Sequence, residues 1–374
     1  MKLQGLLAWF LTGILVLSVV AGCATPAAQQ APAPQATTAP APGPTQKPAE
    51  APTAAPVPTK AAELPKVNWT LGTCEPSTKD WIIATAIAFT ENVAKRTDGK
   101  FTIKVTVGDE LGVQRAQLPQ VLSKGTIEMS FISQGQTGTF PHEAIFALPF
   151  LIGSKKGVLE DGIAIDAATR QITDREFERM GFKTLFFFVQ TPTQLISNKP
   201  IDNISDLKGL KVRAWDDTTS NIVKNLGGVP VVMPVAEVYT AMQRGVVDAV
   251  LTGAPAMVST AVYENGKYLY IVNLAPACQH VVYNIQAFKG LPAEYQKVLL
   301  EEGKVAEKLY QERQPTVEKE AIDLMKSKGV QVFEPSKEQM AKAREKVLPI
   351  WDAWAAQKPI NQETYDAVKK AFGF

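Results

Sequence analysis

The chain has 374 residues, of which 45% are hydrophobic and 20% are charged, and its 39 Lys and Arg nearly balance its 37 Asp and Glu. This length predicts about two domains, and the balanced charge argues against a dedicated nucleic-acid-binding protein, which usually carries a basic face. Three Cys and two His are too few for a disulfide-rich scaffold or for a cluster of His and Cys metal ligands.

An apolar run near the N-terminus, residues 6–21, follows a short segment that carries the charged side chain of Lys2. A membrane-spanning helix needs about 20 apolar residues, so this shorter run is more typical of a signal peptide, which we place at residues 1–22. The run ends in Val-Ala-Gly before Cys23, a pattern that resembles the bacterial lipobox, in which the Cys is lipidated and becomes the new N-terminus. Lipidation of Cys23 is therefore predicted. The alternative is a retained anchor helix in which this Cys is incidental.

The next segment, residues 23–64, contains 10 Pro and 14 Ala and no aromatic residue. Such a composition cannot bury enough apolar surface to offset the conformational entropy lost on folding, and its Pro content favours extended conformations. We interpret the segment as a tether between a lipid at Cys23 and a folded body. No later run is long and apolar enough to span a bilayer, so we expect a soluble body from about residue 65 onward.

Strand and helix patterns alternate in the first part of this body. Hydrophobic periodicity predicts strands at 67–73, 101–107 and 127–132, helices at 78–96 (capped by Ser77 or Thr78), 114–123 and 156–180, and a buried strand at 183–189. This order predicts a sheet with parallel strand pairs and with helices on its faces.

A second α/β set follows in the chain. We predict strands at 210–214, 229–233, 247–251, 268–273, 281–286 and 330–333, and helices at 218–226, 235–242 and 292–327. We expect the long helix to be interrupted near Pro315, and Ser336 with Gln339 indicates the cap of a final helix. Two α/β units predict a ligand site between the domains, at the carboxyl ends of their strands. This architecture suits a binding protein and a hydrolase equally.

The usual motifs of hydrolases, zinc peptidases, redox proteins and nucleotide-binding enzymes are missing from the sequence. His142 and His280 could each act as a general base, but we interpret both as structural or cleft-edge residues. Asp216 and Asp217 lie where a helix begins, so capping and favourable placement in the helix dipole explain them better than cation binding. We therefore expect no cofactor and no metal ion.

Cys74 and Cys278 are the remaining cysteines once Cys23 is assigned to a lipid. Both follow predicted strands, and an exported protein can form disulfides. The spacing along the chain does not establish the Cα separation that a disulfide requires. Cys74 and Cys278 could therefore form a disulfide or be two separate thiols, and both alternatives stay open.

Three blocks of sequence resemble the substrate-binding proteins of TRAP transporters, the DctP-like family. They are Lys199-Pro-Ile201, Asp206-Leu-Lys-Gly-Leu-Lys-Val-Arg213, and the segment from Met233 to Asp248, and their order and spacing are more specific than any one block. Residues 146–151 and the pair Leu291-Pro292 resemble further blocks of that family. The resemblance spans about residues 67–374, which is the whole predicted body.

This resemblance implies an α/β, two-lobed, periplasmic-binding-protein-like (Venus flytrap) fold with two mixed sheets flanked by helices and a long bracing helix. We place lobe I at residues 65–190 plus 279–318 and lobe II at 191–278 plus 319–374. Two hinge strands, near Val189 and Val281, would let the lobes close.

The resemblance also implies a function. The protein would capture a small organic acid outside the cytoplasmic membrane and deliver it to an ion-gradient-driven permease with a small and a large membrane subunit. It would be extracytoplasmic, in the periplasm or at the cell surface, and attached to the cytoplasmic membrane through Cys23. No nucleic-acid partner and no enzymatic activity are expected. A receptor for a membrane sensor kinase and an exported two-domain enzyme are the alternatives.

The family pairs an Arg in the Leu-Lys-x-Arg block with the ligand carboxylate, and Arg213 matches this position. A guanidinium meets a carboxylate through two parallel hydrogen bonds, which Lys cannot reproduce. From the residues alone, an Arg paired with Asp216 or Asp217 is equally plausible. Thr252 replaces an Asn that often contacts the carboxylate, and Thr193 replaces a second Arg found in some acid-sugar binders. The missing second Arg at Thr193 argues against a sialic acid or a dicarboxylate.

Trp215 lies two residues after Arg213, so both side chains can face the same way from a strand. It either walls an apolar or aromatic ligand or packs at the strand end. We therefore favour a monocarboxylate with an apolar or aromatic body. By their positions in loops and at a helix start, further candidates for contact with the ligand are Gln134, Gln190, Glu75 and Glu237.

Overall fold

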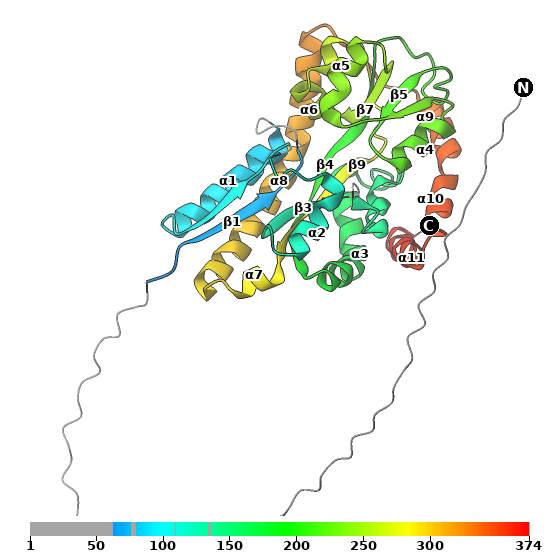
Figure 1. The fold of residues 1–374 in the computed structure, drawn as a ribbon. Coiled ribbons are helices and arrows are strands. Elements are labelled where there is room, and N and C mark those ends of the chain that lie inside the picture. Colours follow the sequence, from blue (N-terminus) through cyan, green and yellow to red (C-terminus); the bar gives the residue numbers. More distant parts are fainter. Residues whose placement is uncertain (1–62, 76–79, 109, 134–135, 374) are drawn as a thin grey trace, which may run out of the picture. The chain divides into compact units, whose positions relative to one another are not determined.

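The computed structural model describes residues 63–75, 80–108, 110–133 and 136–373. The predicted signal peptide, Cys23, nearly all of the tether and Gln134 lie outside the described residues. The described chain is an α/β structure with two mixed sheets that share one long strand (Figure 1).

Sheet A has the strand order β2-β1-β3-β9-β4. Its strands are β1 (Val67–Gly72), β2 (Phe101–Val105), β3 (Met129–Ser133), β9 (Pro276–Asn284) and the first part of β4 (Phe182–Ser197). β1 pairs in parallel with β2 and β3, whereas β9 runs antiparallel to both β3 and β4. The carboxyl ends of the parallel strands β1 and β3 therefore lie at one edge of the sheet.

Sheet B uses the second part of β4. Its other strands are β5 (Lys211–Ala214), β6 (Val229–Val232), β7 (Ala249–Gly253), β8 (Tyr268–Tyr270) and β10 (Gln331–Phe333). β5 pairs in parallel with β6 and β7, and β4 runs antiparallel to β7 and β8. The register of β4 against β9 shifts between Val189 and Pro192, where the strand passes from one sheet to the other.

Seven α-helices and four 3-10 helices of the described chain cover these sheets before the long helix begins. They are α1 (Trp81–Arg96), α2 (Leu118–Ser123), α3 (Val158–Arg179), α4 (Asp217–Asn225), α5 (Val238–Gln243), α6 (Ala254–Ser259), α7 (Ile285–Lys289), and the 3-10 helices η1 (Arg115–Gln117), η3 (Pro141–Ala147), η4 (Val235–Glu237) and η5 (Val262–Glu264). The cap of α1 is Asp80, whose side chain accepts from the backbone N–H of Ile82, so the predicted cap at Ser77 or Thr78 is wrong. The predicted helix at 114–123 is divided into η1 and α2.

The long helix α8 (Ala293–Ser327) packs on both sheets. Tyr295 near its start and Tyr310 at its middle join the core that covers sheet A, and near its end Ala321 and Met325 join a core beside sheet B. The predicted bracing helix is therefore confirmed (Figure 1). The predicted interruption near Pro315 is wrong, because the helix continues through it.

Three helices follow β10 where the sequence predicted one. They are α9 (Lys337–Val347), α10 (Pro349–Ala355) and α11 (Pro359–Phe372). Ser336 caps α9 by accepting from the backbone N–H of Gln339, as predicted. α9 packs on the core of sheet B, whereas α10 and α11 pack with η3 and α3 against sheet A. The lobe boundaries stay a prediction, and this packing favours placing α10 and α11 with lobe I rather than lobe II.

Tyr310 offers a direct measure of how strongly α8 is held. Its ring stacks on Phe188 of β4 with centroids 3.9 Å apart, and its hydroxyl donates to the carbonyl of Ile82 at 2.6 Å. Tyr310→Ala should lower the free energy of unfolding by about 3–5 kcal/mol, and Tyr310→Phe by about 1 kcal/mol. Urea denaturation measures both. Lys308→Ala, on an exposed position of the same helix, is the control, and an equal loss in all three variants would contradict this account.

Candidate functional site

Arg213 is the central residue of the candidate site. It lies near the carboxyl end of β5, between β6 and β7. Its side chain is 4% exposed. Its Nε donates to the carbonyl of Met233 and its Nη1 to the carbonyl of Leu251, both at 3.1 Å. Two neighbouring strand ends therefore fix the direction of the guanidinium.

The charge of Arg213 has no close counter-ion. Among the described residues, no carboxylate oxygen lies within 4.0 Å of the guanidinium. Burial lowers the pKa of Arg213 to about 10, and the charge of Asp216 opposes this shift. A buried cation without a partner is costly, so such a position favours the binding of an anion.

The adjacent Asp216 caps a helix rather than pairing with Arg213. Asp216 caps α4, with its carboxylate accepting from the backbone N–H of Thr219 at 2.7 Å and from the Thr219 hydroxyl at 2.8 Å. Burial raises the pKa of Asp216. The capping interpretation of this acid is confirmed, and the alternative of a close Arg213–Asp216 or Arg213–Asp217 ion pair is wrong.

Three other predicted residues lie beside Arg213. The guanidinium carbon of Arg213 is 5.7 Å from the centroid of the Trp215 ring, within the range of a cation–π contact. Trp215 also packs against the core of sheet B, which is the packing role that the sequence allowed, whereas its contact with a ligand stays a prediction. Thr252 follows Leu251 on β7, and Thr193 on β4 pairs with the next residue, Gly253. Both threonines are buried, so their hydroxyl groups are held in fixed positions.

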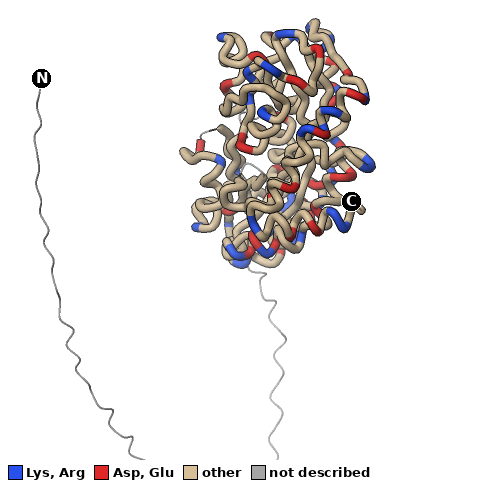
Figure 2. The backbone as a smooth tube through the Cα atoms, turned by 90° about the vertical axis from the view of Figure 1, so that its right-hand side faces the viewer, with Lys and Arg blue, Asp and Glu red and all other residues tan. Residues whose placement is uncertain are grey.

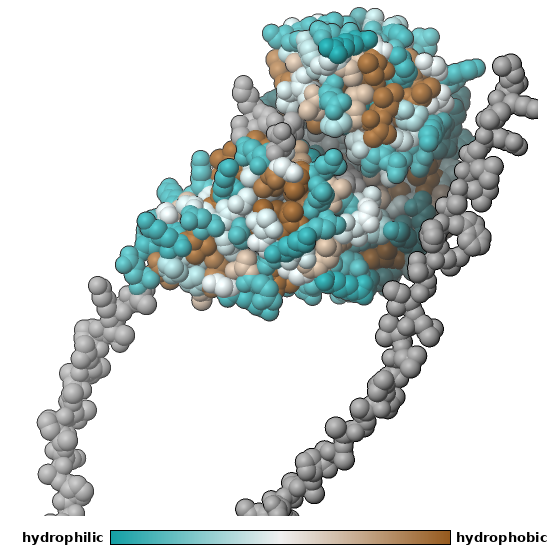
Figure 3. Space-filling view, in the orientation of Figure 1, coloured by the Kyte–Doolittle hydropathy of each residue, from teal (hydrophilic) through white to brown (hydrophobic). Residues whose placement is uncertain are grey.

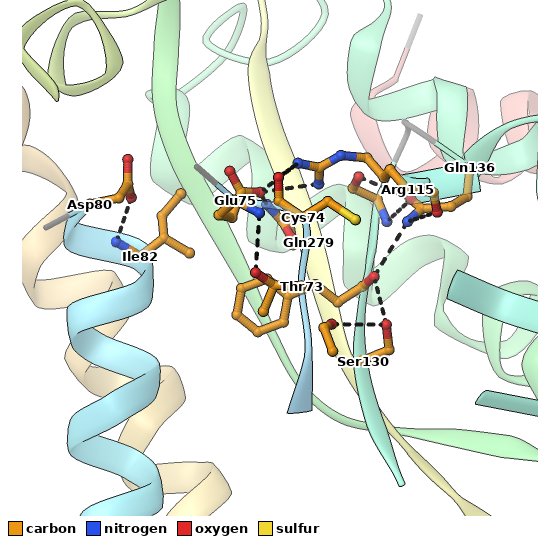
Figure 4. Close-up of polar contacts among 12 residues, drawn as sticks. Thr73, Cys74, Glu75, Asp80, Ile82, Arg115, Ser130, Gln136 and Gln279 are labelled. Carbon is orange, nitrogen blue, oxygen red and sulfur yellow. Dashed lines mark hydrogen bonds and ion pairs between the residues drawn. The ribbon is translucent and has the colours of Figure 1, made fainter. Parts of the chain in front are cut away.

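Glu75 lies at the corresponding edge of sheet A, after β1 (Figure 4). Its Oε1 accepts from Nη1 and Nη2 of Arg115, both at 3.1 Å, and from Nε2 of Gln279 at 3.2 Å. The charge of Glu75 raises the pKa of Arg115. Sequence reasoning missed Arg115 and Gln279, because partners 40 and 204 residues away leave no local signal.

Asp80 adds a second acid near this edge. Burial raises its pKa to about 7, and the charge of Glu75 contributes to the shift. The edge of sheet A, one wall of the candidate site, therefore carries the Glu75–Arg115 ion pair and the Asp80 carboxyl group, whose pKa is near 7. The edge of sheet B, the other wall, carries Arg213, which forms no ion pair with the described residues.

For Gln190 and Glu237 the structure gives less support for contact with a ligand. The carbonyl of Gln190 accepts from Nε2 of Gln314 on α8 at 3.2 Å, so this residue helps to join β4 to the helix. Glu237 is exposed at the end of η4, and its carboxylate has no hydrogen bond within the described part of the chain. The structure does not bring Glu237 into contact with Arg213.

The two histidines lie in the interior, away from this site. His142 and His280 flank the buried Glu143, with N–O distances of 3.4 Å each. Burial lowers the pKa of His142. Neither ring is exposed by more than 1%, which agrees with the structural role that we predicted and not with a cleft-edge base. The two described cysteines, Cys74 and Cys278, are not joined in a disulfide.

In the views of Figures 2 and 3, neither a single sign of charge nor apolar residues cover the visible face of the described chain. Lys and Arg alternate with Asp and Glu over the tube in Figure 2. In Figure 3 hydrophilic residues dominate the visible face, with smaller apolar patches between them. An anion that approaches these faces therefore meets charges of both signs.

Comparison with known proteins agrees with this geometry. The family described as "Bacterial extracellular solute-binding protein, family 7" matches residues 71–358. The C4-dicarboxylate-binding periplasmic protein of Rhodobacter capsulatus is 28% identical over 295 residues, covering 76% of this chain and 85% of that protein.

Solved structures show the same fold. An extracytoplasmic solute receptor of Bordetella pertussis that binds pyroglutamic acid has a TM-score of 0.74 and 24% identity, covering 81% of this chain and 99% of that one. A TRAP periplasmic solute-binding protein of Desulfovibrio salexigens with bound orotic acid has a TM-score of 0.72 and 25% identity, covering 82% and 99%. The chain has this two-lobed fold and belongs to family 7 of the bacterial extracellular solute-binding proteins, the family of TRAP transporter receptors.

Proposed function

We propose that this protein is the extracytoplasmic receptor of a TRAP transporter and that it captures a small organic acid between its lobes. The observation that carries this proposal is the buried guanidinium of Arg213, which has no carboxylate partner in the described chain. The ligand is then delivered to a permease with a small and a large membrane subunit, driven by an ion gradient. The protein acts without chemical turnover.

The hydrogen bonds of Arg213 suit a carboxylate ligand. A guanidinium has five N–H donors, and the two that face Met233 and Leu251 leave three for an incoming ligand. Because those two carbonyl groups already hold the side chain, little side-chain freedom is lost on binding. Thr252, in the next position after Leu251, can donate one further hydrogen bond.

The surroundings of Arg213 favour one charged end on the ligand. Thr193 is neutral, so no second cation faces a second carboxylate from this position of β4. Trp215 offers the flat face of a ring next to the guanidinium. We therefore propose a monocarboxylate with an apolar or aromatic body, and the single carboxyl group of the pyroglutamic acid and orotic acid bound by the Bordetella and Desulfovibrio proteins supports the monocarboxylate part of this proposal.

The opposite wall would receive the rest of the ligand. Glu75 is held by Arg115 and Gln279, so a hydrogen-bond donor on the ligand can meet a carboxylate whose charge is largely balanced. We propose Gln134 and Gln190 as further contacts from their positions in the sequence. The lobes would close by bending where β4 and β9 pass between the sheets, near the register shift after Val189.

Replacing Arg213 tests this proposal. Arg213→Ala should weaken binding of pyroglutamate or orotate by at least about thirtyfold, because truncating one partner of a buried charged pair costs about 2 kcal/mol or more. Arg213→Lys should recover only part of the affinity, since an ammonium group lacks the planar fork. Calorimetry measures affinity, and circular dichroism checks that each variant is folded.

Arg244→Ala, an exposed arginine after α5, is the control and should bind as the unchanged protein does. Before the variants are compared, a thermal-shift screen against organic acids identifies a ligand, because a molecule that binds only the folded state raises its stability. Unchanged affinity in Arg213→Ala would reject the role of this residue. A screen in which only neutral sugars act would reject the carboxylate class.

We also propose that a lipid on Cys23 attaches the protein to the cytoplasmic membrane and that residues 23–64 act as the tether. The small residues before Cys23 and the Pro and Ala content of the segment support this proposal. Within the described ranges, none of the helices combines the length and the apolar character that crossing a membrane requires.

Cys23→Ser tests the anchor. In cells fed an alkyne-tagged fatty acid, the unchanged protein should carry the label and sediment with membranes, whereas Cys23→Ser should lose the label, because Ser has no thiol to accept the lipid. Cys74→Ser is the matched control and should stay labelled. Equal labelling of all three proteins would contradict lipidation at Cys23.

A further inference from the structure

Gln194 of β4 joins three segments of the chain that pass between the two sheets. Its Oε1 accepts from the backbone N–H of Val272 at 2.8 Å and of Asn273 at 3.0 Å. Its Nε2 donates to Oδ1 of Asn273 at 2.7 Å and to Oε1 of Glu318 at 3.0 Å. Backbone N–H groups can only donate, so the orientation of the amide is fixed and all four of its hydrogen-bonding positions are used.

These partners lie on three of the connections between the two sheets. Asn273 lies between β8 and β9, Glu318 lies on α8, and Gln194 lies just beyond the register shift of β4. One turn earlier on α8, Gln314 donates to the carbonyl of Gln190 at 3.2 Å. By the predicted boundaries Gln194 and Asn273 lie in lobe II and Glu318 lies at the end of the lobe I part of α8, so the bond between Gln194 and Glu318 is the one that a relative movement of the lobes would act on.

Glu318 is the ionisable member of this cluster. Its second oxygen, Oε2, is buried and makes no hydrogen bond of good geometry with the described residues. Burial raises the pKa of Glu318 to about 7, against the lowering effect of Gln194 and Thr191. A buried carboxylate oxygen without a donor disfavours the ionised form. When protonated, Oε2 becomes a donor, and the adjacent Thr191 hydroxyl can accept from it.

No charged neighbour accounts for this behaviour. The groups that face Glu318 from β4 are Gln194 and Thr191, and both are neutral. The connection to β9 contributes the neutral Asn273, and α6, which also packs against α8, has no charged residue. On α8 itself, Arg313 donates to Thr85, and Lys319 is paired with Asp323.

We propose that Glu318 is a positioning residue of the ligand site, which acts through Gln194 to fix the relative placement of the two lobes and shifts that placement when it gains or loses a proton. The link to the site is short, because Gln194 follows Thr193 and pairs with Thr252 across the sheet. The consequence for ligand binding rests on the proposed function, whereas the effect on lobe placement does not.

The sign of the pH dependence follows from the raised pKa. If movement exposes the carboxyl group to water, its pKa returns toward the ordinary value of 4.5. The arrangement described above is then fully favoured below about pH 4.5, is lost progressively as the pH rises to about 7, and changes no further above that. The ratio of the two arrangements changes by at most about 300-fold over this range.

Lobe placement can be measured without any ligand. We would attach spin labels, through unnatural amino acids, at the exposed positions Lys104 on β2 and Asn225 on α4 of the full chain, and measure their separation by pulsed EPR from pH 4.5 to 8. The unchanged protein should show a distance distribution that shifts between pH 4.5 and 7. Glu318→Gln, a neutral side chain of the same shape, should keep the low-pH distribution throughout.

Glu320→Gln is the matched control, because Glu320 is an exposed carboxylate two residues further along α8. It should retain the shift of the unchanged protein. A shift that persists in Glu318→Gln, or no shift in the unchanged protein, would overturn the proposal. Carbon-13 NMR of labelled Glu residues adds a second readout, in which the resonance that titrates near pH 7 should disappear in Glu318→Gln. Failure of Arg213→Ala to affect binding would leave these measurements unchanged, so the two proposals fail separately.

Discussion

Strand β4 forms backbone hydrogen bonds in both sheets, and the rest of the structure depends on this constraint. β4 pairs with β9 through its first part and with β7 and β8 through its second part. Its backbone is thus bonded on both sides of the passage between the lobes, so neither lobe can shift without bending the same strand. This arrangement places Thr193 opposite Gly253 of β7 on one side and Phe188 against Tyr310 of α8 on the other.

The candidate site combines two walls of different electrostatic character. Around Arg213, backbone carbonyls hold a cation that forms no ion pair with the described residues, whereas Glu75 on the other wall is paired with Arg115. A ligand with one negative end fits this difference better than a neutral sugar does. The near-zero net charge of the whole chain agrees with a site whose attraction acts over short distances.

Much of the fold could be predicted from sequence, because periodic apolar residues report which face of a strand or helix is buried. The second half of β4 could not be predicted from sequence, because Gln190, Pro192 and Gln194 interrupt its apolar pattern. These residues lie where the strand passes from one sheet to the other, and the sequence does not reveal that junction. Pro349 and Pro359 lie at the first positions of α10 and α11, where proline is favoured, so they are sequence signals for the starts of these two helices. Arg213 could be assigned because a local motif carries it, whereas the partners of Glu75 come from distant parts of the chain.

Pro315 gives α8 an uneven stiffness along its length. A helix of 35 residues spans roughly 50 Å at about 1.5 Å per residue, and a proline in its interior removes one backbone hydrogen bond. The missing bond is the one that position 315 would donate to the carbonyl of Gln311, so the weakened turn includes Gln314, which bonds to β4, and ends three residues before Glu318, which also does. Bending α8 at this turn should therefore need less elastic work than bending it elsewhere along its length.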